Sequence, residues 1–286
     1  MKQLDEQELV AVAIEAAALA GVAAVDPGVL YAGSSVIIAL GPEGPVARAG
    51  GTTAVVRDLD AHYMRDTVLA SWLSDAGAPV VRPWDPSGPF IIRGRVVSLW
   101  TRAVTTPPAD PSQAGRALRR CHQALRTFSG PLPSVVGLIE EARRIAAGAE
   151  LDESDRNTLH RAFAYADEVL NGHGLPEQAL HGDAGMGNVL TGGIWHDWED
   201  ACRGPLVWDL ASLVSTARIT GRTPGRAEAM LRAYGNAPGL DQLDHFVAVR
   251  GIQVLAWSLL GSAHDGQLHP STITRLRWVR EHNWAV

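Results

Sequence analysis

The segment from Leu180 to Asp200, LHGDAGMGNVLTGGIWHDWED, limits what this chain can fold into more than any other stretch. Three short apolar runs alternate with glycine-rich turns, a pattern typical of short strands rather than of a helix. Asp183 follows the first run, Asn188 begins the second, and Asp197 ends the third. Because tight turns bring the ends of neighbouring strands together, we expect these three side chains to converge.

The three side chains suit metal and proton chemistry. Carboxylate and amide oxygens bind hard divalent cations, so Asn188 and Asp197 could hold one cation while Asp183 remains nearby as a base. Asp, Asn and Gly are also the usual residues of turns, and each acid alone is more often a turn former than a ligand. The ordered spacing of acid, amide and second acid, each at a strand boundary, favours the site.

The first hundred residues predict a strand-rich unit. The Ala-rich run from residue 9 to residue 25 predicts a packed helix rather than a membrane segment, because Glu15 interrupts it and its flank is acidic. Residues 28–49 predict hairpin strands, and residues 60–77 have the apolar spacing of a helix. Two further strand segments are expected at residues 78–84 and 88–100.

The pattern becomes helical after Trp100. A connection rich in Pro and Thr, residues 105–113, precedes helices expected at residues 114–128, 135–147, 154–170, 207–219, 226–235, 240–264 and 274–284. Short strands are expected between them at residues 178–180, 188–190 and 194–198. The sequence therefore predicts an α+β fold in which a small sheet lobe precedes a large helical lobe, with a cleft between them.

Composition limits the class of partner. The net charge is −6, the pI is near 5.9 and no basic run occurs, which argues against a nucleic-acid partner. Cys121 and Cys202 are too few for a disulfide framework, so a cytoplasmic location is expected, with no membrane partner. Lys2 is the only lysine, and any role usually given to lysine must here fall to arginine or be absent.

The blocks HGDAGMGN and HDWEDACRGPLVWDLASL resemble the aminoglycoside-phosphotransferase and choline-kinase-like families, which are relatives of the eukaryotic protein kinases. Their signature is H-G-D-x-x-x-x-N, then D-W-E, then D-L-A. The resemblance implies a bilobal protein-kinase-like fold with a small antiparallel-sheet N-lobe and a large, mainly helical C-lobe. The nucleotide-binding lobe would span residues 1–100, with a hinge near residues 98–103, and the lobe with the catalytic loop and acceptor site would span residues 101–286.

The resemblance also implies roles for the residues of the three blocks. Asp183 would accept or orient the proton of the attacking hydroxyl, while Asn188 and Asp197 would hold Mg²⁺ against the phosphates of ATP. His181 would pack beneath the catalytic turn, and Asp209 would brace that turn through hydrogen bonds.

The first lobe should contain the groups that bind ATP. Gly33, Ser34 and Ser35 resemble the tip of the nucleotide-covering hairpin, although such residues form ordinary turns in most proteins. Arg48 stands where these families carry a phosphate-binding lysine, and Asp66 stands at the position of the glutamate that pairs with it. The longer arginine could compensate for the shorter aspartate. The alternatives are a solvated strand arginine and a surface-helix aspartate.

The hinge and the acceptor site are the least specified regions. Backbone groups around Ser98, Leu99 and Trp100 would bind adenine, although the same run also fits a buried strand. The residues that could contact an acceptor in the second lobe are Glu199, Asp200, Trp257 and Asp265. A cationic acceptor would favour carboxylates in this lobe, and a tryptophan could stack on a ring or enclose a cation. Surface acids and core tryptophans are common, so these features favour the assignments only slightly.

Together these features predict an ATP- and Mg²⁺-dependent phosphotransferase that acts on a hydroxyl of a small-molecule acceptor. An aminoglycoside or another antibiotic is the first choice of acceptor, and an amino alcohol, sugar or amino acid is the alternative. A nucleotide-binding protein with little transferase activity is a second hypothesis, motivated by Arg48 and Asp66. Metal-dependent hydrolysis ranks last, because the histidines are too scattered to bind a metal without nucleotide.

Overall fold

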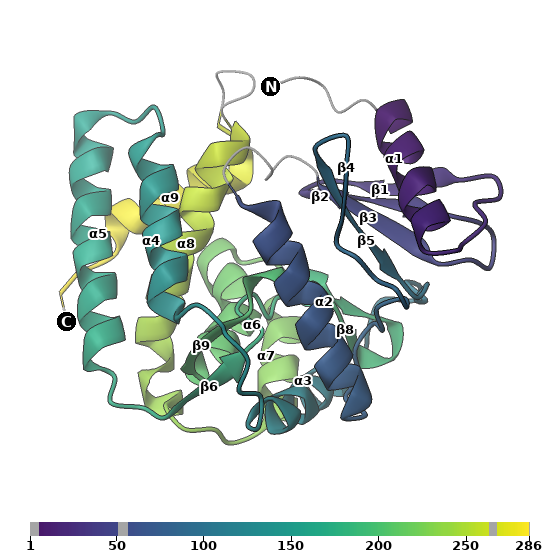
Figure 1. Ribbon diagram of the computed structural model, residues 1–286. Coiled ribbons are helices and arrows are strands. Elements are labelled where there is room, and N and C mark those ends of the chain that lie inside the picture. The colour runs from purple at the N-terminus through teal and green to yellow at the C-terminus, as the bar shows by residue number, and fades with distance from the viewer. Residues whose placement is uncertain (1–5, 51–56, 263–267, 286) are drawn as a thin grey trace. The chain divides into compact units, whose positions relative to one another are not determined.

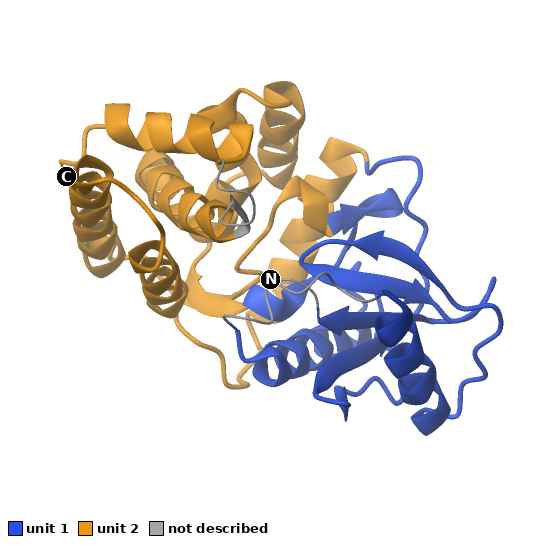
Figure 2. Cartoon of the chain, turned by 90° about the horizontal axis from the view of Figure 1, so that it is seen from above, with its two compact units in different colours: residues 1–109, 189–200 blue, residues 110–188, 201–286 orange. Residues whose placement is uncertain are grey.

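The computed structural model describes residues 6–50, 57–262 and 268–285. The chain forms two compact units (Figure 2). Unit 1 comprises Met1–Ala109 and Val189–Asp200, and unit 2 comprises Asp110–Asn188 and Ala201–Val286. Asp183 and Asn188 therefore belong to unit 2, whereas Asp197 belongs to unit 1.

Unit 1 contains an antiparallel sheet with the strand order β1-β2-β3-β5-β4 (Figure 1). Its strands are β1 (Gly28–Ala32), β2 (Ser35–Ala39), β3 (Val46–Gly50), β4 (Phe90–Ile92) and β5 (Arg95–Trp100). Turn residues separate these strands in sequence, as the pattern predicts. β3 and β5 lie in the interior of the sheet, so the backbone of each is paired on both sides.

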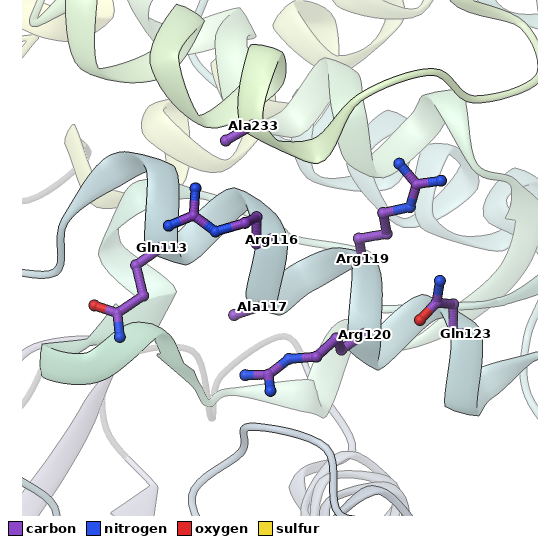
Figure 3. Close-up of a pocket in the computed structure, with 7 residues that line it drawn as sticks. All are labelled: Gln113, Arg116, Ala117, Arg119, Arg120, Gln123 and Ala233. Atoms are coloured by element: carbon purple, nitrogen blue, oxygen red, sulfur yellow. The ribbon is translucent and has the colours of Figure 1, made fainter.

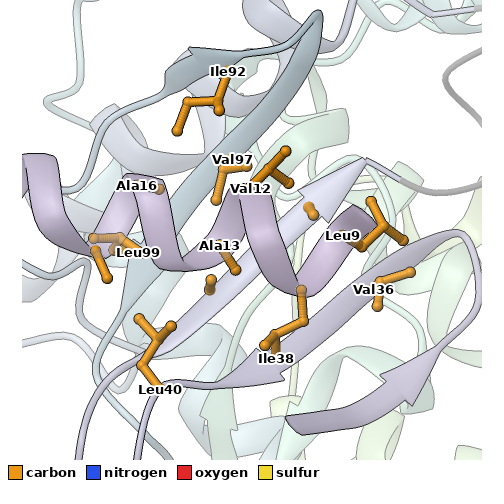
Figure 4. Packing of buried hydrophobic residues seen from close by; sticks show 13 residues of the cluster. Leu9, Val12, Ala13, Ala16, Val36, Ile38, Leu40, Ile92, Val97 and Leu99 are labelled. Atoms are coloured by element: carbon orange, nitrogen blue, oxygen red, sulfur yellow. The ribbon is translucent and has the colours of Figure 1, made fainter. Parts of the chain in front are cut away.

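One face of the sheet is covered by α1 (Glu6–Leu19). Leu9, Val12 and Ala13 of this helix pack with buried side chains of the sheet such as Ile38 and Leu99 (Figure 4). The small alanines of α1 allow its axis to lie close to the strands, and the burial of this apolar face stabilises the unit. The prediction of a packed helix near the N-terminus is confirmed.

The other side of β3 contacts α2 (Leu59–Asp75), whose N-cap Asp58 accepts a hydrogen bond from the backbone N–H of Ala61. Ala47 and Ala49 of β3 belong to the core beneath α1. Because side chains alternate along a strand, Arg48 between them points away from α1 and toward α2. The sheet thus places a buried arginine opposite the acid of α2.

The strand expected at residues 78–84 is wrong. The structure has only isolated bridges there, at Val80 and Pro83. Pro79 and Pro83 have no backbone N–H, so a continuous ladder cannot form. The segment instead lies along β5, where Trp84 donates its backbone N–H to the Leu99 carbonyl at 2.9 Å.

The remaining part of unit 1 is a short hairpin that leads to Asp197. It consists of β7 (Val189–Leu190), η3 (Thr191–Gly193), β8 (Ile194–Trp195) and η4 (Trp198–Asp200). The strand expected at residues 194–198 therefore ends early, because Asp197 adopts a left-handed backbone with φ of 69°. This turn directs the chain into η4, which packs against α2.

Unit 2 is mainly helical, as expected. Its helices are α3 (Pro111–Leu125), α4 (Val135–Ala147), α5 (Glu153–Gly172), α6 (Val207–Thr220), α7 (Pro224–Tyr234), α8 (Leu243–Ser262) and α9 (Pro270–Glu281), with a short η5 (Leu240–Gln242) before α8. α8 packs against α4, α5, α6 and α9. By length and composition the segment Leu240–Leu260 could cross a membrane, but 67% of its most apolar window is buried inside the protein, as in a core helix.

A small two-stranded sheet precedes the loop that carries Asp183. β6 (Glu177–Leu180) pairs with β9 (Cys202–Pro205), and η2 (Met186–Asn188) ends the loop. β9 was not expected, because its sequence CRGP has neither alternation nor β-branched residues. The sheet unit and the helical unit together confirm the predicted α+β class.

Candidate active site

The turn after β6 is held by Asp209, which lies in the first turn of α6. Its carboxylate accepts hydrogen bonds from the backbone N–H groups of His181 at 2.7 Å and Gly182 at 2.9 Å. His181 is fully buried, and its Nδ1 accepts the N–H of Asp183 at 3.3 Å. Asp209 therefore makes the hydrogen bonds to the turn that were predicted, and His181 is buried as predicted. The part that either residue plays in catalysis stays a prediction.

Asp209 has a further partner that the sequence did not reveal. The Nε2 of His122 lies 2.8 Å from its Oδ2, and the Nδ1 of the same ring lies 2.8 Å from the Tyr234 hydroxyl. Burial acts to raise the pKa of Asp209, but the hydrogen bond with His122 and those from the backbone outweigh it, so the pKa is lowered. Asp209 is therefore an ionised group at the base of the turn.

His122 could have been found from one signal, its position on the apolar face of α3. It lies next to Cys121 and one turn after Leu118, both of which are buried. A histidine on such a face requires a polar partner, but the sequence cannot say that the partner is Asp209, 87 residues away.

Asp183 follows this braced turn, and its side chain is 36% exposed. The Asn188 amide donates Nδ2–H to the Asp183 carbonyl at 2.8 Å and to its Oδ2 at 3.2 Å. Within unit 2, the structure thus brings together two of the three residues from which the sequence argument began. Asn188 and Asp183 lie in one loop, with the carboxylate partly open to solvent.

Arg250 of α8 is a second partner of Asp183 that the sequence argument missed. Its Nη2 donates to Asp183 Oδ1, and its Nη1 donates to Gln253 Oε1. The arginine is buried, with 5% exposure. The available signal was a charged residue inside the apolar run FVAVRGIQVLAW, because such a residue requires a buried counter-ion.

Arg48 in unit 1 is surrounded by three carboxylates. Its Nη1 donates to Asp66, and its Nη2 donates to Asp197 Oδ1 at 2.7 Å and Glu199 Oε2 at 2.6 Å. The guanidinium carbon also lies 4.8 Å from the centre of the Tyr63 ring. The predicted contact between Arg48 and Asp66 is confirmed, and the interpretation of Arg48 as a solvated strand residue is wrong because the residue is buried.

Two of the acids around Arg48 have raised pKa values. Burial raises the pKa of Asp66 to about 6 and that of Glu199 to about 8, although Arg48 acts in the opposite direction. Glu199 also accepts from Arg57 at 2.9 Å, and the neighbouring Asp200 accepts from Arg57 at 2.6 Å. Arg48 and Arg57 therefore form a largely buried ion-pair cluster with Asp66, Asp197, Glu199 and Asp200.

The predicted phosphate-covering turn occupies the tip of the hairpin between β1 and β2. Gly33 and Ser34 form the turn, Ser35 begins β2, and the Gly33 N–H donates to the Ser35 carbonyl at 3.0 Å. Ser34 is exposed, and Gly33 and Ser35 are half-buried. A role in binding phosphate stays a prediction.

The backbone of the predicted hinge is already paired within unit 1. Leu99 donates to Ser87 at 2.8 Å and accepts from Trp84, while Ser98 pairs with Arg48 across β3 and β5. The Trp100 indole donates to Ser98 Oγ at 2.8 Å. An adenine contact at Leu99 would have to displace these bonds, so the chain after the end of β5 is better placed to provide it.

Unit 2 also has an open pocket of about 640 Å³ that is lined by α3 and by one residue of α7 (Figure 3). Its lining residues are Gln113, Arg116, Ala117, Arg119, Arg120, Gln123 and Ala233. None of the residues predicted for catalysis or binding lines it.

Comparison with protein families decides the class of this chain. Residues 51–246, more than half of the chain, match the model of the phosphotransferase enzyme family. The chain belongs to this family. A comparison with curated protein sequences gave no significant match.

Solved structures resemble this phosphotransferase along almost its whole length. A choline/ethanolamine kinase family protein from Mesorhizobium loti is 18% identical, with a TM-score of 0.63 over 96% of this chain and 98% of that chain. Amicoumacin kinase hAmiN, solved with AMP-PNP, Ca²⁺ and Ami, is 14% identical, with a TM-score of 0.70 over 96% and 95%. A thermostable mutant of aminoglycoside phosphotransferase APH(4)-Ia, solved with ADP and hygromycin B, is 17% identical, with a TM-score of 0.65 over 97% of each chain. The predicted protein-kinase-like fold is confirmed.

The residues predicted to contact the acceptor are divided between the two units of the phosphotransferase. Glu199 and Asp200 are bonded to arginines of unit 1. Trp257 is a half-buried residue of α8 in unit 2. Asp265 lies outside the described residues. An acceptor role for any of these four residues stays a prediction.

Proposed function

We propose that this protein transfers the γ-phosphate of ATP to a hydroxyl of a small molecule, in the presence of Mg²⁺. The observation that carries the proposal is the state of Asp183, a partly exposed carboxylate fixed by Asn188 and Arg250 on a turn braced by Asp209. A carboxylate held in this way can orient a hydroxyl and accept its proton, which is the contribution that phosphoryl transfer requires of a side chain.

The residues proposed to hold Mg²⁺ have suitable chemistry. Asn188 donates through Nδ2 to two oxygens of Asp183, which directs its Oδ1 away from that carboxylate. An amide oxygen directed in this way, together with the carboxylate of Asp197, is the type of hard donor that Mg²⁺ prefers. When bound, the ion would neutralise charge on the phosphates.

The nucleotide would be bound by groups of unit 1. The tip around Gly33 and Ser34 would offer backbone N–H groups to phosphate oxygens, that of Gly33 only after release from the Ser35 carbonyl, and Arg48 would offer a cation. Asp66 would hold Arg48 in place from α2. Backbone groups after Trp100 would contact adenine.

We propose an aminoglycoside or another antibiotic as the first acceptor to test, and an amino alcohol, sugar or amino acid as the alternative. Support for the first choice is the similarity in fold to structures that contain hygromycin B or Ami. The alternative is supported by the similarity to a choline/ethanolamine kinase family protein. Both groups share the fold equally well.

The test is a screen for ATP consumption with Mg²⁺ across aminoglycosides, other antibiotics, amino alcohols, sugars and amino acids. Mass spectrometry of any hit should show the addition of one phosphate. Asp183→Ala and Asp197→Ala are the matched variants, and both should lose most of the turnover while remaining folded by circular dichroism. Wild-type turnover no greater than that of both variants would refute the proposal.

One contact favours a second candidate, a nucleotide-binding protein with little transferase activity. Arg48 donates to Asp197, the proposed ligand of Mg²⁺, and so competes with a cation for the same carboxylate. In that case ATP should bind with nearly the same affinity with and without Mg²⁺, and no acceptor should be phosphorylated. Titration with a fluorescent ATP analogue in Mg²⁺ and in EDTA separates the two candidates.

A further inference from the structure

Arg250 occupies a position where a charged side chain is costly. It lies in the middle of α8, the helix that packs against four others in unit 2 (Figure 1). Only 7% of its side chain is exposed. A buried guanidinium needs a counter-ion and hydrogen-bond acceptors to offset its desolvation. The contacts that it makes therefore indicate why an arginine is present at this point in the fold.

Those contacts lead to the catalytic turn. The guanidinium donates to Oδ1 of Asp183 and to Oε1 of Gln253, one helical turn further along α8. It also lies 5.8 Å from the ring of Trp208, whose indole N–H donates to the Gly182 carbonyl at 2.9 Å. Arg250 and Trp208 thus contact the turn from the interior of unit 2, whereas the Asp183 side chain on the same turn is partly exposed.

The two oxygens of Asp183 differ in their surroundings. Oδ1 is bonded by the buried Arg250, whereas Oδ2 has the longer contact of 3.2 Å with Asn188. We infer that Arg250 is a positioning residue for Asp183, which fixes Oδ1 and leaves Oδ2 to receive the proton of the attacking hydroxyl. This inference rests on the proposed phosphotransferase function.

The chemical step assigns each atom a place. The acceptor oxygen forms a bond to the γ-phosphorus, and the bond from that phosphorus to the bridging oxygen of ADP breaks, with the electron pair leaving on ADP. The hydroxyl proton moves to Oδ2 of Asp183. Arg250 keeps the plane of the carboxylate fixed, so that Oδ2 faces the hydroxyl when the reaction occurs.

The test uses the full chain and Mg²⁺–ATP with water as the acceptor, and it measures the release of inorganic phosphate. Arg250→Met should lower kcat by about 100-fold, because a misoriented carboxylate loses much of its effect, while KM for ATP should change by less than about threefold. The kcat of Arg250→Lys should be at least about tenfold higher than that of Arg250→Met, because lysine keeps a cation. It should remain below the wild-type kcat, because lysine can replace only part of the forked contact.

Chemical rescue separates positioning from a purely structural role. Guanidinium at about 20 mM should restore kcat of Arg250→Ala by about tenfold. Arg143→Met is the matched control, since Arg143 pairs with Asp167 at 2.7 Å in the same unit and is half-exposed. This control should keep the wild-type kcat and should show no response to guanidinium.

The outcomes distinguish this inference from the proposed function. Equal phosphate release by the wild type and Asp183→Ala would refute the function. An inactive Asp183→Ala together with wild-type kcat in Arg250→Met would overturn only the role of Arg250. Should Arg250→Met fail to fold, Arg250→Lys decides: a kcat about three- to tenfold below wild type with unchanged KM for ATP supports the role, and a kcat within about twofold of wild type overturns it.

Discussion

Replacing Arg48 by methionine should destabilise unit 1 in a manner that depends on pH. The substitution keeps much of the side-chain volume but removes the cation shared by Asp66, Asp197 and Glu199. Only 7% of the Arg48 side chain is exposed, so water cannot replace the lost charge. Removing one partner of a buried ion pair costs about 3–5 kcal/mol in the free energy of unfolding, and we expect a loss in this range at pH 8.5.

The loss should be smaller at low pH, because the acids can protonate. In the wild type, burial already raises the pKa of Asp66 to about 6 and that of Glu199 to about 8. Without Arg48 both values rise further, so the native variant binds more protons than the native wild type in this pH range. Each extra proton bound by the native state changes the slope of the free energy of unfolding against pH by about 1.4 kcal/mol per pH unit. At pH 5.5 the expected loss is roughly 1–2 kcal/mol on the same basis.

Urea unfolding followed by circular dichroism at pH 5.5 and pH 8.5 measures both values. Arg93→Met is the control, since Arg93 pairs with Glu15 on the surface, with 56% and 43% of the two side chains exposed. Its loss should stay below about 0.5 kcal/mol at both pH values. A loss below about 1 kcal/mol for Arg48→Met at pH 8.5, or an equal loss at both pH values, would refute the argument that Arg48 neutralises buried acids.

Three further predictions follow from packing and charge. Gly115→Ala should lower the free energy of unfolding in urea by about 2–4 kcal/mol, because the new Cβ would lie 2.1 Å from the Met230 carbonyl oxygen. Gly172→Ala is the control and should be neutral or stabilising, because its Cβ would meet nothing within 4 Å. The wild type should lose stability as pH rises from about 4.5 to 8, since the raised pKa of Glu199 makes the native state bind more protons than the unfolded state; a stability that rises through this window would contradict that sign. Asp209 has a lowered pKa, so its contribution should be lost as pH falls through about 4 and below, and Asp209→Asn should flatten the acid limb of the curve.

The elements that the sequence predicted correctly depend on local periodicity. α3 has apolar residues on one face, and this spacing predicts a helix at residues 114–128. The helix begins three residues earlier, at Pro111 after the N-cap Asp110, and ends at Leu125. The strand expected at residues 88–100 is divided into β4 and β5 by a turn at Arg93 and Gly94, both of which have a positive φ. Local periodicity was therefore sufficient to locate these elements, but it did not fix their ends.

The elements that were missed depend on distant partners. Residues 78–84 have an apolar strand composition, but they pair only at isolated points, with Trp195 of β8 and with the end of β5. Two prolines prevent a ladder. β9 is a strand because Cys202 pairs with Leu180, and nothing within CRGP indicates this. His122 and Arg250 were missed for the same reason, since each is defined by an acid on another element.

The length of the Arg48 side chain explains only one of its contacts, the pairing with Asp66. A longer cation was expected to compensate for a shorter acid, and the two side chains do meet. Reach alone does not explain the remaining contacts. The guanidinium has two terminal nitrogens, and Nη1 bonds α2 through Asp66 while Nη2 bonds Asp197 and Glu199. The three N–H groups of a lysine ammonium share one nitrogen, so they span a shorter distance between acids than the two terminal nitrogens of a guanidinium do. The arginine therefore ties α2 to the turn that carries Asp197, and a change to lysine should loosen that turn even though the charge is kept.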